Sequence, residues 1–138
     1  MFGYVLQDWT TIRGQNTAGL TITQNESDWM GFSSFQDMVF WIDTREATFS
    51  GASLSLALQT SPSKDDVLFQ SMYTASFVAA GYTPGLVFSG VNLPRVILAA
   101  GPSVPLSTWV RWQLSQSGAT APWDLTFRIL VSANRVWK

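Results

Sequence analysis

Two runs in the last third of the chain alternate apolar and polar residues with a period of two, which is the spacing of side chains along a β-strand. The first run spans residues 108–114 and the second spans residues 123–131. One face of each run is wholly apolar, with Val110, Trp112 and Leu114 in the first and Trp123, Leu125, Phe127, Ile129 and Val131 in the second. A short stretch of small, polar and Pro residues separates the runs. We therefore predict a β-hairpin whose apolar face packs against a second sheet.

The opposite face of this predicted hairpin is polar and aromatic. A register that pairs the end of the first strand with the start of the second places Trp109 across from Arg128, and Arg111 diagonally near Asp124. The first pair predicts an exposed cation–π contact, and the second predicts an ion pair of little net value in water. Trp and Arg dominate the binding energy of protein interfaces, so this face is a candidate protein-contact patch. The alternative is that these pairs only cover one face of the sheet.

Short strand patterns separated by turn residues recur through the rest of the chain. Strands are predicted over 38–42, 52–59, 85–89 and 95–99, a strand or one helical turn over 67–73, and turns over 60–66 and 81–85. The run 38–42 is continuously apolar, so it is interpreted as a strand covered on both faces. About seven or eight short strands without an amphipathic helix predict an all-β fold, an antiparallel β-sandwich or jelly roll. Residues 1–35 are expected to form an extended N-terminal arm or short edge strands, and residues 36–138 the β-sandwich domain.

The residues that carry most enzyme chemistry are missing from this chain. Its 138 residues include no His and no Cys, which removes Ser/His and Cys/His nucleophiles, thiolate metal sites and disulfides. The carboxylates that could act as acid and base have no supporting pattern; they are Asp37, Asp43, Glu46, Asp65, Asp66 and Asp124. The oxygen-bearing residues 25–28 do not have the spacing of a calcium loop. We therefore expect no catalytic residues, no metal, no cofactor and a protein that is not an enzyme.

Charge and hydropathy argue against nucleic-acid and membrane partners. The formal net charge is −1 and the eight basic residues are spread along the chain, so no basic patch for direct nucleic-acid binding is expected. The N-terminus lacks the pattern of a signal peptide and no apolar run reaches about 18 residues, so we expect no membrane contact and synthesis in the host cytoplasm. Only 12% of the residues are charged and 14% are aromatic, which is typical of proteins that bury surface in permanent contacts.

Three stretches of the sequence together carry a resemblance to a known class of protein. They are Gln59-Thr60-Ser61-Pro62 after an alternating strand, Trp109-Val110-Arg111-Trp112-Gln113-Leu114, and Trp123-Asp124-Leu125-Thr126-Phe127-Arg128-Ile129-Leu130-Val131. In pattern, roughly residues 50–135 resemble small β-sandwich structural proteins of tailed bacteriophages, of the capsid decoration or capsid-associated type. The resemblance implies a virion component that forms a symmetric homo-oligomer, often a trimer, and binds the major capsid protein or another virion protein. It transfers no binding residue by position.

The predicted contact residues come from the hairpin and from the N-terminal segment. They are Trp9, Ile12, Arg13, Trp109, Arg111 and Arg128. The N-terminal segment is expected to drape over a neighbouring subunit or to add a strand to its sheet by edge pairing.

Two other functions remain open at the level of sequence. One is a carbohydrate-binding module in which aromatic rings stack on sugars, and its candidates are Trp9, Trp29, Tyr82 and Trp109. The other is a phage tail or receptor-binding component. Aromatic rings gathered on one face with polar groups nearby favour sugar binding, whereas rings that face another chain favour a lattice protein.

Overall fold

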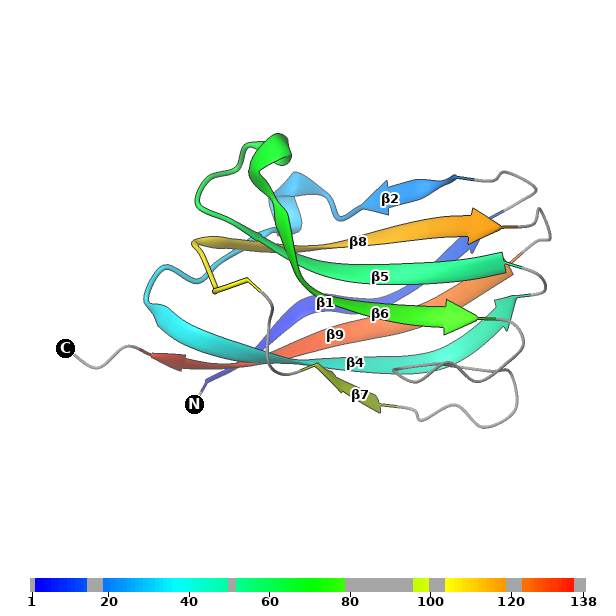
Figure 1. The fold of residues 1–138 in the computed structure, drawn as a ribbon. Coiled ribbons are helices and arrows are strands. Elements are labelled where there is room, and N and C mark those ends of the chain that lie inside the picture. The colour runs from blue at the N-terminus through cyan, green and yellow to red at the C-terminus, as the bar shows by residue number, and fades with distance from the viewer. Residues whose placement is uncertain are drawn as a thin grey trace.

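The computed structural model describes residues 2–14, 19–49, 52–78, 96–99, 104–118 and 123–135, and it arranges them as two antiparallel sheets that face each other (Figure 1). Sheet A has the strand order β1-β9-β4-β7, formed by Phe2–Gly14, Trp123–Arg135, Phe35–Phe49 and Val96–Ala99. Sheet B has the order β2-β8-β5-β6, formed by Thr21–Thr23, Trp109–Gly118, Ala52–Ser61 and Gln70–Val78, and β3 (Met30–Gly31) also pairs with β8. Two short 3-10 turns, η1 (Glu26–Asp28) and η2 (Asp66–Leu68), accompany sheet B. The predicted all-β antiparallel sandwich is confirmed.

The predicted hairpin is wrong, because its two strands lie in different sheets. β8 pairs with β5 in sheet B, whereas β9 lies between β1 and β4 in sheet A. The two apolar faces meet across the core instead, where the rings of Trp112 and Phe127 make an edge-on contact with centroids 5.3 Å apart. A period-two pattern identifies the buried side of each strand, and a sandwich satisfies it equally well by placing the two strands face to face.

The core lies between the inner faces that the sequence pattern predicts. Along β9, every second side chain from Trp123 to Ala133 is buried. On the facing sheet, the alternating leucines of β5 at positions 54, 56 and 58 are each no more than 1% exposed. Fully burying one side chain of this size contributes about 1.5–3 kcal/mol, so these two strands supply much of the hydrophobic stabilisation.

Other local predictions have mixed outcomes. The run 38–42 lies within the 15-residue strand β4, where Phe40 and Ile42 point into the core but Trp41 is 40% exposed on the outer side. The expectation of a strand covered on both faces is therefore wrong at Trp41. Residues 67–73 divide between the turn η2 and the start of β6, and the strand expected over 95–99 matches β7. The strand predicted over 85–89 lies outside the described residues.

The N-terminal segment contributes to both sheets. β1 lies at the edge of sheet A, where it pairs with β9 and places Leu6 in the core. β2 and β3 both pair with β8 at the edge of sheet B. The domain boundary expected at residue 35 stays a prediction. Within the described part of the chain, no helix is long and apolar enough to cross a membrane.

Candidate functional site

Exposed large apolar side chains occur in pairs on the two outer sides of the sandwich. On the outer side of sheet A, Val5 is 53% exposed and Trp41 is 40% exposed. On η2, which projects from the sheet B side in Figure 1, Val67 is 77% exposed and Leu68 is 44% exposed. Phe2, at the start of β1, is 41% exposed but lies against Arg135, whose guanidinium is 4.6 Å from its ring centroid. The two pairs are therefore the candidate contact surfaces.

The first pair borders a shallow depression on the outer side of sheet A. Val5, Leu130 and Trp41 form one row across β1, β9 and β4, because Leu130 is in register with both of the others. Gly3 and Ser132 pair in the row beside it, and their small side chains leave space above the sheet. The resulting depression has a volume of about 350 Å³ and is lined by Gly3, Tyr4, Val5, Trp41, Leu130, Val131 and Ser132. We call it the sheet A depression.

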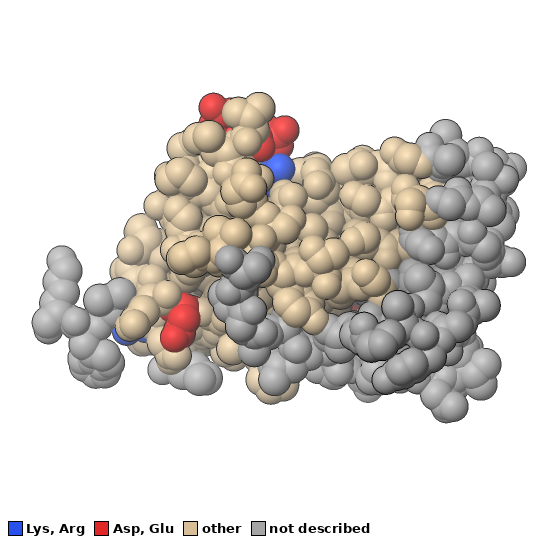
Figure 2. Space-filling model, in the orientation of Figure 1, with Lys and Arg blue, Asp and Glu red and all other residues tan. Residues whose placement is uncertain are grey.

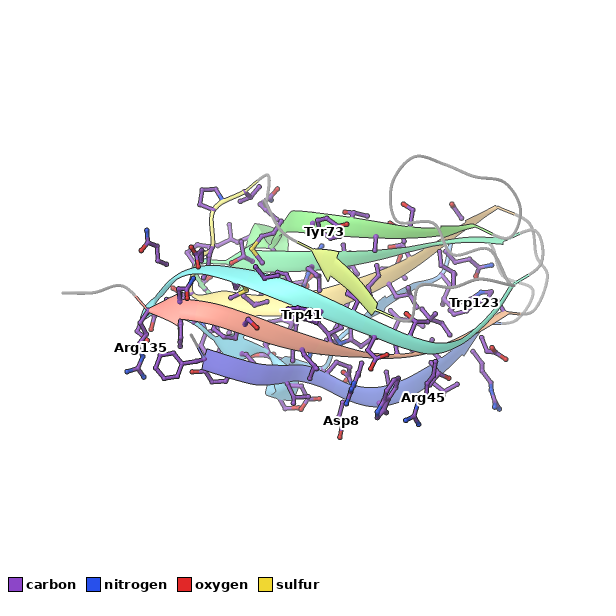
Figure 3. All side chains as sticks on the ribbon, turned by 90° about the horizontal axis from the view of Figure 1, so that it is seen from below. Asp8, Trp41, Arg45, Tyr73, Trp123 and Arg135 are labelled. Atoms are coloured by element: carbon purple, nitrogen blue, oxygen red, sulfur yellow. The ribbon has the colours of Figure 1, made fainter. Side chains whose placement is uncertain are left out.

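Trp41 is held at the rim of this depression by a polar contact. Its indole Nε1 donates a hydrogen bond to Ser132 Oγ at 3.1 Å, so the ring has a defined orientation while its face stays exposed. Figure 3 views the molecule from the sheet A side and shows Trp41 and Arg45 on this surface. An oriented aromatic ring beside an apolar hollow is the kind of group that anchors a protein interface.

A cluster of one tryptophan and two arginines adjoins the depression. The guanidinium carbons of Arg45 and Arg128 lie 4.3 Å and 4.9 Å from the ring centroid of Trp9. Arg128 Nε also donates to Asp43 Oδ2 at 2.9 Å, and Asp43 is almost completely buried. Arg128 is therefore fixed on two sides, whereas Arg45 is exposed and pairs with no carboxylate among the described residues. Arg128 lies two residues from Leu130 on the same face of β9, so this basic and aromatic cluster lies beside the row of Val5, Leu130 and Trp41.

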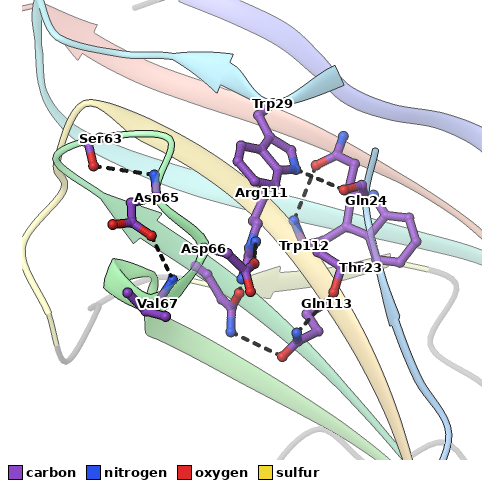
Figure 4. A network of polar contacts seen from close by, with 11 residues as sticks. Thr23, Gln24, Trp29, Ser63, Asp65, Asp66, Val67, Arg111, Trp112 and Gln113 are labelled. Carbon is purple, nitrogen blue, oxygen red and sulfur yellow. Dashed lines mark hydrogen bonds and ion pairs between the residues drawn. The ribbon is translucent and has the colours of Figure 1, made fainter. Parts of the chain in front are cut away.

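Arg111 was expected on an exposed face, and the structure buries it. It does point outward from sheet B, but only 3% of the residue is exposed, because two turns cover it. Its guanidinium lies 4.9 Å from the ring centroid of Trp29 and 3.9 Å from that of Phe69. Its Nε donates to Gln59 Oε1 at 2.8 Å and its Nη1 pairs with Asp66, as Figure 4 shows. Arg111 is a structural clamp between β8 and η2, and the ion pair predicted with Asp124 is wrong.

The other predicted contact residues are dispersed. The cation–π pair predicted between Trp109 and Arg128 is wrong, because Lys64 lies over Trp109 with its Nζ 4.5 Å from the ring centroid, and Arg128 lies over Trp9. Ile12 packs against the core, and Arg13 is exposed at the end of β1. Of the six predicted residues, the structure brings only Trp9 and Arg128 into contact.

Sequence reasoning missed Val5 and Trp41, the exposed apolar pair of sheet A. Trp41 lies inside a continuous apolar run, which signals burial, and nothing local shows that one side of β4 is left uncovered. Val5 lies in the segment expected to form an N-terminal arm or short edge strands, and neither alternative indicates which of its side chains are exposed. The single available signal was the unusual size of Trp41 within a run of otherwise aliphatic and Phe residues.

The described acidic residues were compared with the arrangements that bind metals or act as acid/base pairs. The described part of the chain contains no cluster of three or more His, Cys, Asp or Glu side chains that could hold a metal ion. Three of the six carboxylates considered as acids or bases make structural contacts: Asp43 with Arg128, Asp66 with Arg111, and Asp37 as acceptor from Asn134 Nδ2 at 2.8 Å. Asp37 and Asp43 lie six residues apart on β4 and Asp66 lies on η2, and none of the three faces another as an acid/base pair would.

Comparison with known proteins identifies the fold but no family. The sequence matches no protein-family model and no curated protein. The structure is similar to a chain from the structure of infectious bursal disease virus Gx strain, with a TM-score of 0.50, 13% identity, and coverage of 97% of this chain and 32% of that one. A chain from the Gt strain gives a TM-score of 0.51 at 12% identity, covering 97% of this chain and 33% of that one. The chain thus spans about a third of the length of these neighbours, and the likeness is one of fold.

Proposed function

We propose that this chain is a non-enzymatic structural protein of a virion, and that it decorates or stabilises a capsid through protein contacts made by the outer side of sheet A. The observation that carries the proposal is the exposed row of Val5, Leu130 and Trp41 beside the Trp9 cluster. The similarity in fold to chains from two structures of infectious bursal disease virus supports a place in a virion. Its partners in this proposal are further copies of itself and a capsid protein.

The composition of this surface suits a lasting contact. Burying an exposed side chain as large as Val or Trp on a partner contributes about 1.5–3 kcal/mol. Arg128 is already fixed by Asp43 and Trp9, so it loses little side-chain freedom on binding. Only 12% of the chain is charged, so a partner that covers this face desolvates few charges.

Co-sedimentation with virus particles tests the proposal. Particles of the virus that encodes this chain, prepared from a mutant that lacks its gene, are mixed with labelled protein and centrifuged. The wild type is expected to sediment with the particles, and a Val5→Ser, Trp41→Ser variant is expected to bind at least about tenfold more weakly, which corresponds to 1.4 kcal/mol. Thr74→Ser, at an exposed position of β6 in sheet B, is the control and should bind as the wild type does. Wild-type protein that stays in the supernatant, or equal binding by the sheet A variant, contradicts the proposal.

Glycan binding is a second candidate, and one observation favours it. Trp9 and Trp41 lie on the same outer side of sheet A, on the two strands that flank β9, with Arg128 beside Trp9 and Ser132 beside Trp41. Trp29 and Trp109 are engaged with Arg111 and Lys64, and Tyr82 lies outside the described residues. A glycan array probed with the wild type and with Trp41→Ser tests this function. If a sugar stacks on the Trp41 ring, the wild type binds it and the variant does not.

A further inference from the structure

The two exposed apolar pairs are complementary in shape. Val67 and Leu68 lie on η2, a convex turn that projects from the sandwich on the sheet B side (Figure 1). Val5 and Trp41 border the sheet A depression, which is concave and has a volume of about 350 Å³. A projection that carries aliphatic side chains can therefore fit into an apolar hollow of this size and form the apolar centre of an interface.

The surfaces are also complementary in charge. η1, η2 and the cap residue before η2 contain four of the nine acidic residues, which are Glu26, Asp28, Asp65 and Asp66. Figure 2 shows acidic atoms at the projecting end of the molecule. The basic residues beside them are Lys64 and Arg111, so this region, which we call the acidic knob, carries a net charge of −2. The whole chain carries −1, which leaves +1 on all remaining residues. Arg45, exposed and without a carboxylate partner among the described residues, lies over Trp9 in the cluster beside the row of Val5, Leu130 and Trp41.

The acidic knob is held in a fixed conformation before any partner arrives. Asp65 Oδ1 accepts a hydrogen bond from the backbone N–H of Val67 at 3.4 Å, which caps the turn. The next turn residue, Asp66, pairs with the buried Arg111, and Phe69 stacks on the same guanidinium at 3.9 Å. A preorganised projection loses little conformational entropy on docking.

The two surfaces lie on opposite outer sides of one molecule, so a single copy cannot bring them together. We infer that the acidic knob of one copy docks into the sheet A depression of a second copy, with Val67 and Leu68 covering Val5 and Trp41, and with the knob carboxylates facing Arg45. This contact is head-to-tail, and each copy has one knob and one depression, so repetition forms a closed ring or an open array. The inference rests on the proposed function, because it names the partner of the sheet A surface as this chain itself.

Complementation between two variants tests the inference. The knob variant Val67→Ser, Leu68→Ser keeps an intact depression, and the depression variant Val5→Ser, Trp41→Ser keeps an intact knob. Sedimentation velocity over a concentration series is expected to show assembly of the wild type and monomers of each variant alone. An equimolar mixture of the two is expected to form a dimer that grows no further, because only one intact contact is available to each pair. Val5→Asp serves as a second depression variant, and circular dichroism verifies that every variant is folded.

The remaining outcomes distinguish a failure of this inference from a failure of the proposed function. A knob variant that assembles like the wild type overturns the inference, while the proposed function stands if the sheet A variant still loses its binding to virus particles. Monomers in the mixture also overturn it, since face-to-face contact between two depressions cannot be complemented. A wild type that remains monomeric at every concentration overturns it as well. Raising the salt concentration from about 0.05 to 0.5 M is expected to weaken wild-type assembly severalfold, because carboxylate–arginine attraction at a surface is screened.

Discussion

The guanidinium of Arg111 lies 3.9 Å from the ring centroid of Phe69, beneath a surface that the strand pattern assigns to solvent. The pattern is correct about direction, since Arg111 points away from the core that lies between the sheets. The turns η1 and η2 fold over this part of sheet B and bring Trp29 and Phe69 above the side chain. Arg111 therefore lies in a second, smaller buried site on the outer side of sheet B, and its contacts there fix the acidic knob.

Replacing Arg111 is expected to destabilise the fold mainly through lost packing. The Arg111→Ala change removes the buried side chain whose guanidinium packs on the rings of Trp29 and Phe69, together with the hydrogen bond to Gln59, and it should lower the free energy of unfolding by about 2–4 kcal/mol. Arg111→Met keeps most of the volume and should lose about half as much. The ion pair itself contributes little, because the side chain of Asp66 is 76% exposed. Urea unfolding followed by circular dichroism measures these differences.

Lys64→Met is the control for this pair of variants. Lys64 is an exposed cation over Trp109, and its removal should change stability by no more than about 0.5 kcal/mol. Equal losses for Ala and Met at position 111 are inconsistent with a packing role and would assign the effect to the charge and its hydrogen bonds.

Gln24 is expected to be a stronger determinant of stability than its position between two short strands indicates. Its buried amide donates to the Leu6 carbonyl of sheet A at 2.7 Å and accepts from the Trp112 N–H of sheet B at 3.2 Å. Gln24→Ala leaves both backbone groups without these partners and should cost about 2–4 kcal/mol. Asn25→Ala is the control, since Asn25 is exposed and makes no side-chain cap to η1. If Gln24→Ala lowers the free energy of unfolding no more than Asn25→Ala does, the Gln24 side chain does not stabilise the contact between the two sheets.

Two glycines of β1 are expected to differ in their tolerance of the same substitution to alanine. A Cβ at Gly14 would overlap the indole of Trp123, which is itself buried in the core. Gly14→Ala should therefore destabilise the protein by about 1–3 kcal/mol through overpacking. At Gly3 a Cβ meets no atom within 4 Å, so Gly3→Ala should change stability by less than about 0.5 kcal/mol. Thermal unfolding of the two variants side by side decides the matter, and equal shifts in Tm exclude the proposed overlap.

The sequence predicts those features of the fold that depend on single strands. The period-two alternation of β9 and β5 identifies their inner faces because side-chain direction is a local property. Strand pairing depends on the whole chain: β8 and β9 follow each other in sequence, yet each pairs with partners more than fifty residues away, such as Leu56 for Leu114 and Phe40 for Val131. The predicted hairpin failed for this reason.

The candidate site was predicted only in part for a related reason. Trp9 and Arg128 were identified from residue type, because Trp and Arg are the side chains that anchor interfaces. Their neighbour Trp41 was assigned to the interior, because whether the outer side of β4 is covered depends on the path of other segments. Exposure of one strand face is a property of the assembled sandwich, and a single sequence contains no local signal for it.

Replacing Gln116 by an apolar residue is expected to stabilise the fold. Its side chain is buried, and neither amide atom has a hydrogen-bond partner among the described residues. Gln116→Met should raise the free energy of unfolding by about 1 kcal/mol, since it removes an unsatisfied buried amide. Gln113→Met, on the opposite face of the same strand, should instead lower stability by about 1 kcal/mol, because that amide donates to Thr23 Oγ1 at 3.0 Å. Destabilisation by both changes in urea unfolding would show that the Gln116 amide is satisfied in solution.

Alkaline pH is expected to destabilise the protein through Tyr73. Burial raises the pKa of this half-buried hydroxyl above its usual value of about 10, so the folded protein holds the proton more tightly than the unfolded chain does. The contribution of this group is intact below about pH 10 and is lost as the pH rises through the folded-state pKa. Tyr73→Phe removes the titrating group, so the variant should lose less stability than the wild type between about pH 9 and pH 11. Urea midpoints measured across this range give the comparison, and an unchanged slope for Tyr73→Phe rules out this source of alkaline sensitivity.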